Sequence, residues 1–158
     1  MEYVLIDTII FTGKRKINWD AVEAYLKRFS GKIYKVKEYG DEIIVSMNFA
    51  DEFTGSKYTR GLRGSLARVK ANVSQIIPRL IETATNRRWS ENHEEKHSLD
   101  AKGGWYRYDS FFSMPVENKT LEDDKRYRAT LLVRKNDNGN YLHDVVNIKK
   151  EAGNPQES

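Results

Sequence analysis

Residues 126–149, RYRATLLVRKNDNGNYLHDVVNIK, contain the pattern that decides the fold. From Arg126 to Arg134, apolar and polar side chains alternate, which is the period of a β-strand with one buried face. The segment NDNGN at 136–140 is a hairpin signal, because Asn-Gly accepts the positive φ angles of a tight turn. The segment 141–149 then returns as the next strand, so the pattern predicts an antiparallel hairpin.

The segment Gly104–Met114 has the same period of two and predicts a further strand of this sheet. Every second side chain from Trp105 onward lies on one face of this strand, and every second side chain from Tyr106 onward lies on the other. An acidic, exposed loop at 117–125 connects it to the hairpin. The last third of the chain therefore predicts a β-meander.

One face of this sheet is predicted to pack against helices, and the other gathers polar side chains from neighbouring strands. Arg107, Arg128 and Thr130 belong to this second face. We predict that they lie on one exposed surface. The alternative is that they form only the solvent side of a half-buried antiparallel sheet.

Helical signals lie in the first part of the chain. Asn18 is a suitable N-cap, and an apolar stripe at helical spacing follows it as far as Phe29. A long helix begins near Leu62, and Pro78 should kink or break it because proline lacks a donor and clashes with the preceding turn. A second helical piece is predicted at 80–89.

Shorter elements complete the prediction: a strand at 2–11, a hairpin formed by 33–37 and 43–49, and a polar loop at 51–56. The fold class is α+β, with helices, one of them long and kinked at Pro78, packed on an antiparallel sheet that ends in a C-terminal β-meander. We expect one domain over residues 1–151 and a flexible tail at 152–158.

The composition sets limits on the class of protein. The chain has 158 residues, of which 39% are hydrophobic and 32% charged, as in a globular domain with a core. It has no cysteine, which excludes disulfides and fits a reducing cytoplasm. The N-terminal segment lacks a basic leader, and no apolar run approaches membrane-spanning length, so we predict no membrane partner.

Positive charge is concentrated in one segment. Between Lys57 and Arg88 there are eight Lys and Arg residues and one acid, Glu82, whereas the whole chain carries a net charge of only +4. Such a segment favours RNA or another polyanion as a partner, and its arginines Arg63, Arg87 and Arg88 are predicted to contact it. The alternative is a solvated helix face.

No motif for a cofactor is present. The chain has neither a phosphate-binding P-loop nor a dinucleotide-binding glycine motif. The run His93-Glu94-Glu95-Lys96-His97 formally fits the H-E-x-x-H pattern of zinc proteases. Its neighbours are polar and it lies at a predicted helix end, whereas a catalytic zinc helix is buried, so we predict no metal and no cofactor.

Phosphate chemistry without a metal needs few groups. Cleavage of RNA through its own 2′-OH requires one proton acceptor, one proton donor and cations that hold the phosphate. The predicted catalytic residues are His97, Lys96, Arg128 and Thr130. Arg107 could bind phosphate, and Trp105, Tyr106 and Tyr108 could stack on bases. His143, on the last predicted strand, is either a further member or an ordinary surface histidine.

Four stretches carry a family resemblance: DEFTGSKYTRGLRGSLARVKANV (51–73), NRRWSENHEEKHSLDAKGGWYRYDSFFSMP (86–115), YRATLLVR (127–134) and HDVVNIKKEAGNP (143–155). They resemble the third large polyvalent protein-associated domain, found in very large proteins of phages, conjugative elements and other mobile DNA of bacteria. The similarity extends from about Ile17 to Glu151. Its K-H-x-x-D-A-K-G-G-W-Y-R-Y core is specific.

This resemblance implies a relation to the barnase–EndoU–colicin–RelE superfamily of ribonucleases, which combine helices with a four-stranded antiparallel meander. It places Lys96 and His97 at a histidine-bearing helix end, and Arg128 and Thr130 as a pair on the sheet. It leaves His143 in doubt, because a tyrosine is expected there. It also implies the cytoplasm of a bacterial host.

Three functions therefore stay open at this stage. The first is a metal-independent endoribonuclease or RNA-processing domain. The second is a non-catalytic module that binds nucleic acid, or a host or phage protein, in phage–host conflict. The third is a structural domain whose basic segment is only solvated.

Overall fold

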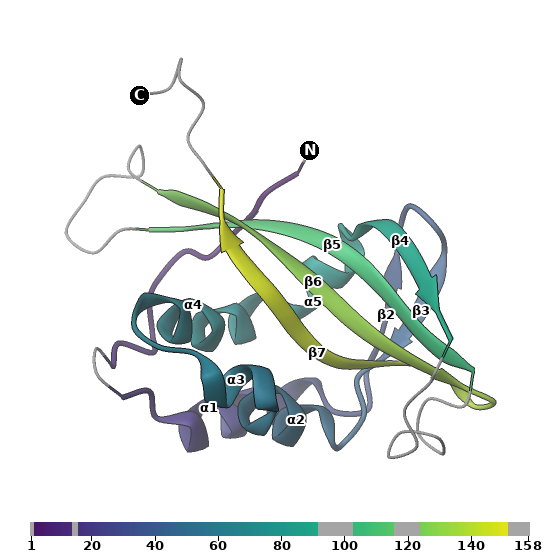
Figure 1. Cartoon of the computed structure of the whole chain (residues 1–158), viewed down its shortest axis with the longest axis horizontal. Helices are drawn as coiled ribbons and strands as arrows, with labels where there is room; N and C mark the ends of the chain where they lie inside the picture. Colours follow the sequence, from purple (N-terminus) through teal and green to yellow (C-terminus); the bar gives the residue numbers. More distant parts are fainter. Residues whose placement is uncertain (1, 14–15, 92–102, 116–123, 152–158) are drawn as a thin grey trace.

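The computed structural model describes residues 2–13, 16–91, 103–115 and 124–151 (Figure 1). The strands are β1 (Val4–Leu5), β2 (Ile33–Val36), β3 (Asp41–Ile44), β4 (Thr85–Ser90), β5 (Gly104–Met114), β6 (Lys125–Asn136) and β7 (Gly139–Lys150). The helices are α1 (Trp19–Leu26), α2 (Phe49–Gly55), α3 (Lys57–Gly61), α4 (Ser65–Val73) and α5 (Ile77–Glu82), with 3₁₀ turns at Lys27–Phe29 and Ser74–Ile76.

The predicted meander is confirmed and forms the centre of the fold. β5, β6 and β7 are consecutive antiparallel neighbours, with Tyr108 paired to Leu131 and Leu131 to Val145. The turn between β6 and β7 consists of Asp137 and Asn138. Figure 1 shows α1–α4 gathered on one side of these three long strands, so the fold is α+β as predicted.

The sheet is mixed, and the prediction of a purely antiparallel sheet is wrong. The strand order is β1-β5-β6-β7-β3-β2, with β4 also paired to β5. β1 runs parallel to β5, and β3 runs parallel to β7. Parallel neighbours need a long connection between them, and the helical segment and the meander supply it here.

The predicted long helix is divided into pieces. α4 ends at Val73, a 3₁₀ turn follows, and Pro78 lies in the first turn of α5 instead of kinking a continuous helix. Proline is tolerated at that position because the first N–H groups of a helix have no intrahelical acceptor. The prediction of helix at 80–89 fails after Glu82, because Thr85–Ser90 pairs with β5 as β4.

The predicted N-terminal strand is shorter than expected. Within 2–11 only Val4 and Leu5 pair with β5. The following residues are held by Asn72 of α4, whose Oδ1 accepts hydrogen bonds from the N–H groups of Ile10 (2.9 Å) and Phe11 (3.1 Å). The amide side chain therefore takes the place of a neighbouring strand.

The predicted loop at 51–56 instead lies mostly in α2. Phe49 and Phe53 are one helical turn apart and fully buried, and this packing stabilises the helix despite its polar composition. The loop at 117–125 and the tail at 152–158 lie largely or wholly outside the described residues.

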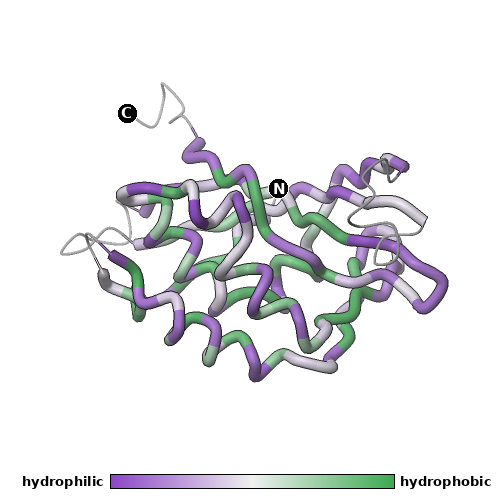
Figure 2. The backbone as a smooth tube through the Cα atoms, turned by 60° about the horizontal axis from the view of Figure 1, so that its bottom comes forward, coloured by the Kyte–Doolittle hydropathy of each residue, from purple (hydrophilic) through white to green (hydrophobic). Residues whose placement is uncertain are grey.

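The core lies between the helical layer and one face of the meander. Tyr108, Phe112, Leu131 and Val133 point into it and are almost completely buried. Figure 2 shows hydrophobic residues along both the helices and the strands of the sheet, with hydrophilic residues between them. The assignment of the two faces of β5 and β6 is therefore confirmed.

Candidate functional site

The predicted site residues that the structure describes are divided between the two sides of the sheet. Arg107, Arg128 and Thr130 lie on the outer face, as their alternation predicts, whereas Tyr106 and Tyr108 lie on the core side. Arg107 pairs with Leu132, four residues along β6 from Arg128. This separation is about 13 Å at the usual strand rise, so the two arginines do not share a cleft. Lys96 and His97 lie outside the described residues.

Polar contacts hold Arg107 and Arg88 on the outer face of the sheet. The Arg107 guanidinium donates to Ser90 Oγ (2.9 Å), and Arg88 of β4 forms an ion pair with Asp109 (3.1 Å). Thr130 lies opposite Asp109 and is buried. These side chains form a polar ladder across β4, β5 and β6.

A second group of predicted residues is centred on Asp41 at the start of β3. Its carboxylate accepts two hydrogen bonds from Arg87 (2.8 and 2.9 Å) and one from the Tyr108 hydroxyl (2.6 Å). The Arg87 guanidinium also lies over the ring of Tyr39, 4.4 Å from its centroid. Burial, and then the bond to the Asp41 carboxylate, raise the pKa of Tyr108 well above its usual range.

The predicted basic segment does not form one cationic face. Arg79 pairs with Glu2 and Glu82, and Lys70 is completely buried. Arg87 and Arg88 are paired as described above. Much of the charge excess is therefore balanced by acids that lie elsewhere in the sequence.

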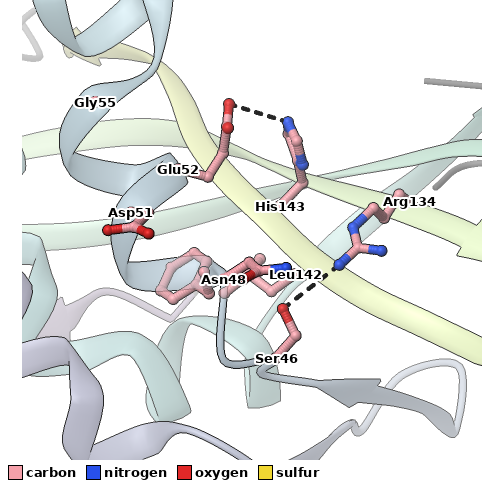
Figure 3. Close-up of a pocket in the computed structure, with 9 residues that line it drawn as sticks. Ser46, Asn48, Asp51, Glu52, Gly55, Arg134, Leu142 and His143 are labelled. Carbon is pink, nitrogen blue, oxygen red and sulfur yellow. Dashed lines mark hydrogen bonds and ion pairs between the residues drawn. The ribbon is translucent and has the colours of Figure 1, made fainter. Parts of the chain in front are cut away.

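His143, which the sequence left in doubt, lies at an irregularity in β7. Val133 pairs with Leu142 and Leu132 with Asp144, so His143 is the extra residue of a β-bulge. Its Nε2 lies 3.1 Å from Glu52 Oε1 of α2, and its ring packs edge-on against Trp105 at 5.0 Å between centroids. Figure 3 shows Glu52 and His143 reaching toward one another across the edge of β7.

A cavity of about 330 Å³ surrounds this pair. Its lining includes Ser46 and Asn48 from the segment before α2 and Arg134 from β6. The Arg134 guanidinium donates a hydrogen bond to Ser46 Oγ at 3.4 Å (Figure 3). It also lies 4.7 Å from the centroid of the Tyr141 ring. The cavity thus combines an imidazole, a guanidinium, a hydroxyl and two carboxylates, those of Asp51 and Glu52.

A buried network lies behind the bulge. Lys70 Nζ donates to Asp144 Oδ1 (2.6 Å) and to Thr59 Oγ1, and the Thr59 hydroxyl donates to the Phe53 carbonyl (2.6 Å). Burial lowers the pKa of Lys70 and raises that of Asp144, and the attraction between the two charges opposes both shifts. This network fixes β7 against the helices next to His143.

Sequence reasoning missed Glu52 and Arg134 as site residues. One signal for the bulge is present, because the polar pair His143-Asp144 interrupts the alternation between Leu142 and Val145. Nothing in the sequence indicates that Glu52 lies opposite His143.

Two further absences concern the described part of the chain. Within it, no group of three His, Cys, Asp or Glu side chains is placed to hold a metal ion. None of its helices is long and apolar enough to cross a membrane. The H-E-E-K-H run at 93–97 lies outside the described residues.

The fold and the cavity define a small α+β domain with helices on one side of a mixed sheet. The family model of the large polyvalent protein-associated domain 3 matches residues 13–145, and the chain belongs to this family. It is therefore a domain associated with phages and mobile elements. No curated protein and no solved structure matches the chain. The relation to the ribonuclease superfamily stays a prediction.

Proposed function

We propose that the chain is a metal-independent, endoribonuclease-like domain whose reaction takes place in the His143 cavity. The observation that carries the proposal is the contact between His143 and Glu52 at 3.1 Å, in a cavity that the Arg134 guanidinium also lines. An acid, a base and a cation for the phosphate are the groups that RNA transesterification requires.

The roles follow from the charge of each group. The Glu52 carboxylate accepts the proton of the 2′-OH, and the 2′-oxygen attacks the neighbouring phosphorus. The P–O5′ bond breaks, and protonated His143 gives its proton to the departing O5′. The products are a 2′,3′-cyclic phosphate and a free 5′-OH. Arg134 binds the phosphate oxygens as their negative charge increases.

The neighbouring residues position this pair. Trp105 packs against the His143 ring, and the Lys70–Asp144 pair holds the adjacent residue of the bulge. The predicted residues Arg128 and Thr130 do not line the cavity, so we assign the reaction to His143, Glu52 and Arg134. The proposed substrate is RNA in a bacterial cytoplasm. The absence of cysteine is in keeping with that reducing compartment.

The test is cleavage of labelled RNA in the presence of a chelator. We expect a cyclic phosphate product, a loss of about 10²–10⁴-fold in rate for His143→Gln and for Glu52→Gln, and no cleavage of a 2′-deoxy substrate. Arg28→Gln is the matched control, because Arg28 lies in the 3₁₀ turn Lys27–Phe29, is exposed and does not line the cavity. A wild type that is inert on varied RNAs would refute the proposal, and a loss confined to His97→Gln would refute the placement at His143.

A second candidate is RNA binding without cleavage, on the outer face of the sheet. Arg128 and Lys149 are exposed cross-strand neighbours there, so two positive charges are adjacent. The same samples decide between the two functions. RNA retention that falls steeply with salt, without any product, would favour this second function.

A further inference from the structure

A second cavity, of about 410 Å³, lies between α1, α2 and the α3–α4 connection. Its volume is within the range of about 300–1,000 Å³ that is usual for ligand pockets. Thr54 of α2 lines it, whereas Glu52 and Gly55 line the His143 cavity. Because Thr54 projects from a different side of α2 than those two residues, the two cavities are separate.

All ionisable side chains that line this second cavity are basic. They are Lys16, Arg60 and Arg63, and all three are exposed. None of them forms an ion pair with the residues that the structure describes. This differs from Lys70, Arg79, Arg87 and Arg88, whose charges are paired within the fold.

The basic side chains are partly preorganised. The Arg63 guanidinium donates through Nη1 to the carbonyls of Arg60 and Leu62, both at 2.9 Å. Two backbone acceptors on one nitrogen fix the plane of the group and leave its other nitrogen atoms as donors. A guanidinium held in this way is suited to bind an oxyanion with little loss of side-chain entropy.

Apolar and aromatic side chains form the wall of the cavity beside these basic groups. Trp19, at the start of α1, is half-buried, packs against the core and lines the cavity together with Ile17. Gly64 precedes α4 and supplies no capping side chain, so the start of this helix adds positive potential to the same cavity. A ligand that fits has an anionic group next to a flat aromatic ring.

We propose that this cavity binds a nucleotide unit, with the phosphate on Arg60, Arg63 and Lys16 and the base against Trp19. The unit is either a free mononucleotide or one residue of a nucleic-acid strand, since both present the same chemistry. The site is independent of cleavage at His143.

The test is titration of the whole chain with AMP, with adenosine and with a short single-stranded oligonucleotide, followed by tryptophan fluorescence and by calorimetry. We expect AMP to bind and adenosine to bind at least about tenfold more weakly, because charged hydrogen bonds are lost. Arg63→Gln should weaken AMP binding by about tenfold or more. Tighter binding of the oligonucleotide than of AMP would identify a strand as the source, and the reverse a free nucleotide.

Lys57→Gln is the matched control, because it removes one exposed positive charge from α3 without changing the cavity lining. If Arg63→Gln changes the structure of the α3–α4 connection, which the Arg63 guanidinium holds, Arg60→Gln provides an independent test of the cavity. Equal binding of AMP and adenosine, equal loss in Lys57→Gln and Arg60→Gln, or no binding of AMP or oligonucleotide at millimolar concentration would each overturn the proposal.

Discussion

His143 and Asp144 are adjacent in the chain, yet their side chains enter opposite environments. The Asp144 carboxylate is 2% exposed and meets the fully buried ammonium of Lys70. The His143 side chain is 15% exposed, and its partner Glu52 is 38% exposed and faces a cavity. The bulge separates a pair that holds the fold together from a pair that water and a substrate can reach. The first should therefore control stability and the second function.

Removal of one member of the buried pair should have the largest effect. We expect Lys70→Met to lower the free energy of unfolding by about 3–5 kcal/mol, because it leaves Asp144 buried without its counter-charge. Urea unfolding followed by circular dichroism measures the loss. The double variant Lys70→Met/Asp144→Leu is the control and should recover most of it. A double variant as unstable as the single one would show that the charges themselves are required.

The hydroxyl of Tyr108 should have an intermediate effect that depends on pH. Tyr108→Phe removes one hydrogen bond to the Asp41 carboxylate, so we expect a loss of about 1–2 kcal/mol at pH 8. Because folding raises the pKa of Tyr108 above its ordinary value of 10.0, its contribution is complete below pH 10 and decreases as the pH rises beyond it.

The decrease should be about 1.4 kcal/mol per pH unit above pH 10, because the unfolded chain releases this proton while the folded chain retains it. Unfolding midpoints of wild type and Tyr108→Phe between pH 8 and pH 11 should therefore converge. Midpoints that stay parallel over this range would contradict the shift. Both proteins contain the other tyrosines, so the difference between their unfolding midpoints reports the effect of Tyr108 alone.

The exposed pair should have the smallest effect on stability. We expect His143→Gln to change the free energy of unfolding by less than about 1 kcal/mol at pH 7, because a partly exposed polar contact contributes little. Thermal unfolding at matched protein concentration measures this. A loss of stability as large as that of Lys70→Met would show that His143 is a structural residue. The His143–Glu52 pair would then not differ in role from the Lys70–Asp144 pair.

The sequence predicted the elements whose pattern is local. Alternation in 104–114 and 126–134 indicated which side of each strand is buried, and Asn18 was identified as the N-cap, where its side chain accepts from the Ala21 N–H. It did not predict β4, because Arg87-Arg88-Trp89 shows neither alternation nor an apolar stripe, and this strand forms only through its pairing with β5. The parallel pairing of β1 is a tertiary contact without a local signal.

The site was less predictable than the fold for the same reason. The sequence suggests that a histidine on the last strand could act, but it does not show that Glu52 of a helix lies opposite it. Lys70 was counted with a basic surface, although its neighbours Val69 and Ala71 share its burial. Charge alone does not indicate which lysine meets a distant carboxylate, because that depends on how β7 packs against α4.

The mixed topology also has a consequence for synthesis on the ribosome. β1 pairs at Val4 with Phe112, and β3 pairs at Ile43 with Asn140, so both strands need partners that are translated about 100 residues later. Contacts between such distant residues slow folding, because long loops must close before any pairing stabilises them. The nascent chain therefore emerges with unpaired strand edges and an incomplete core, and a chaperone that shields those edges until β5 and β7 are synthesised would raise the yield of folded protein.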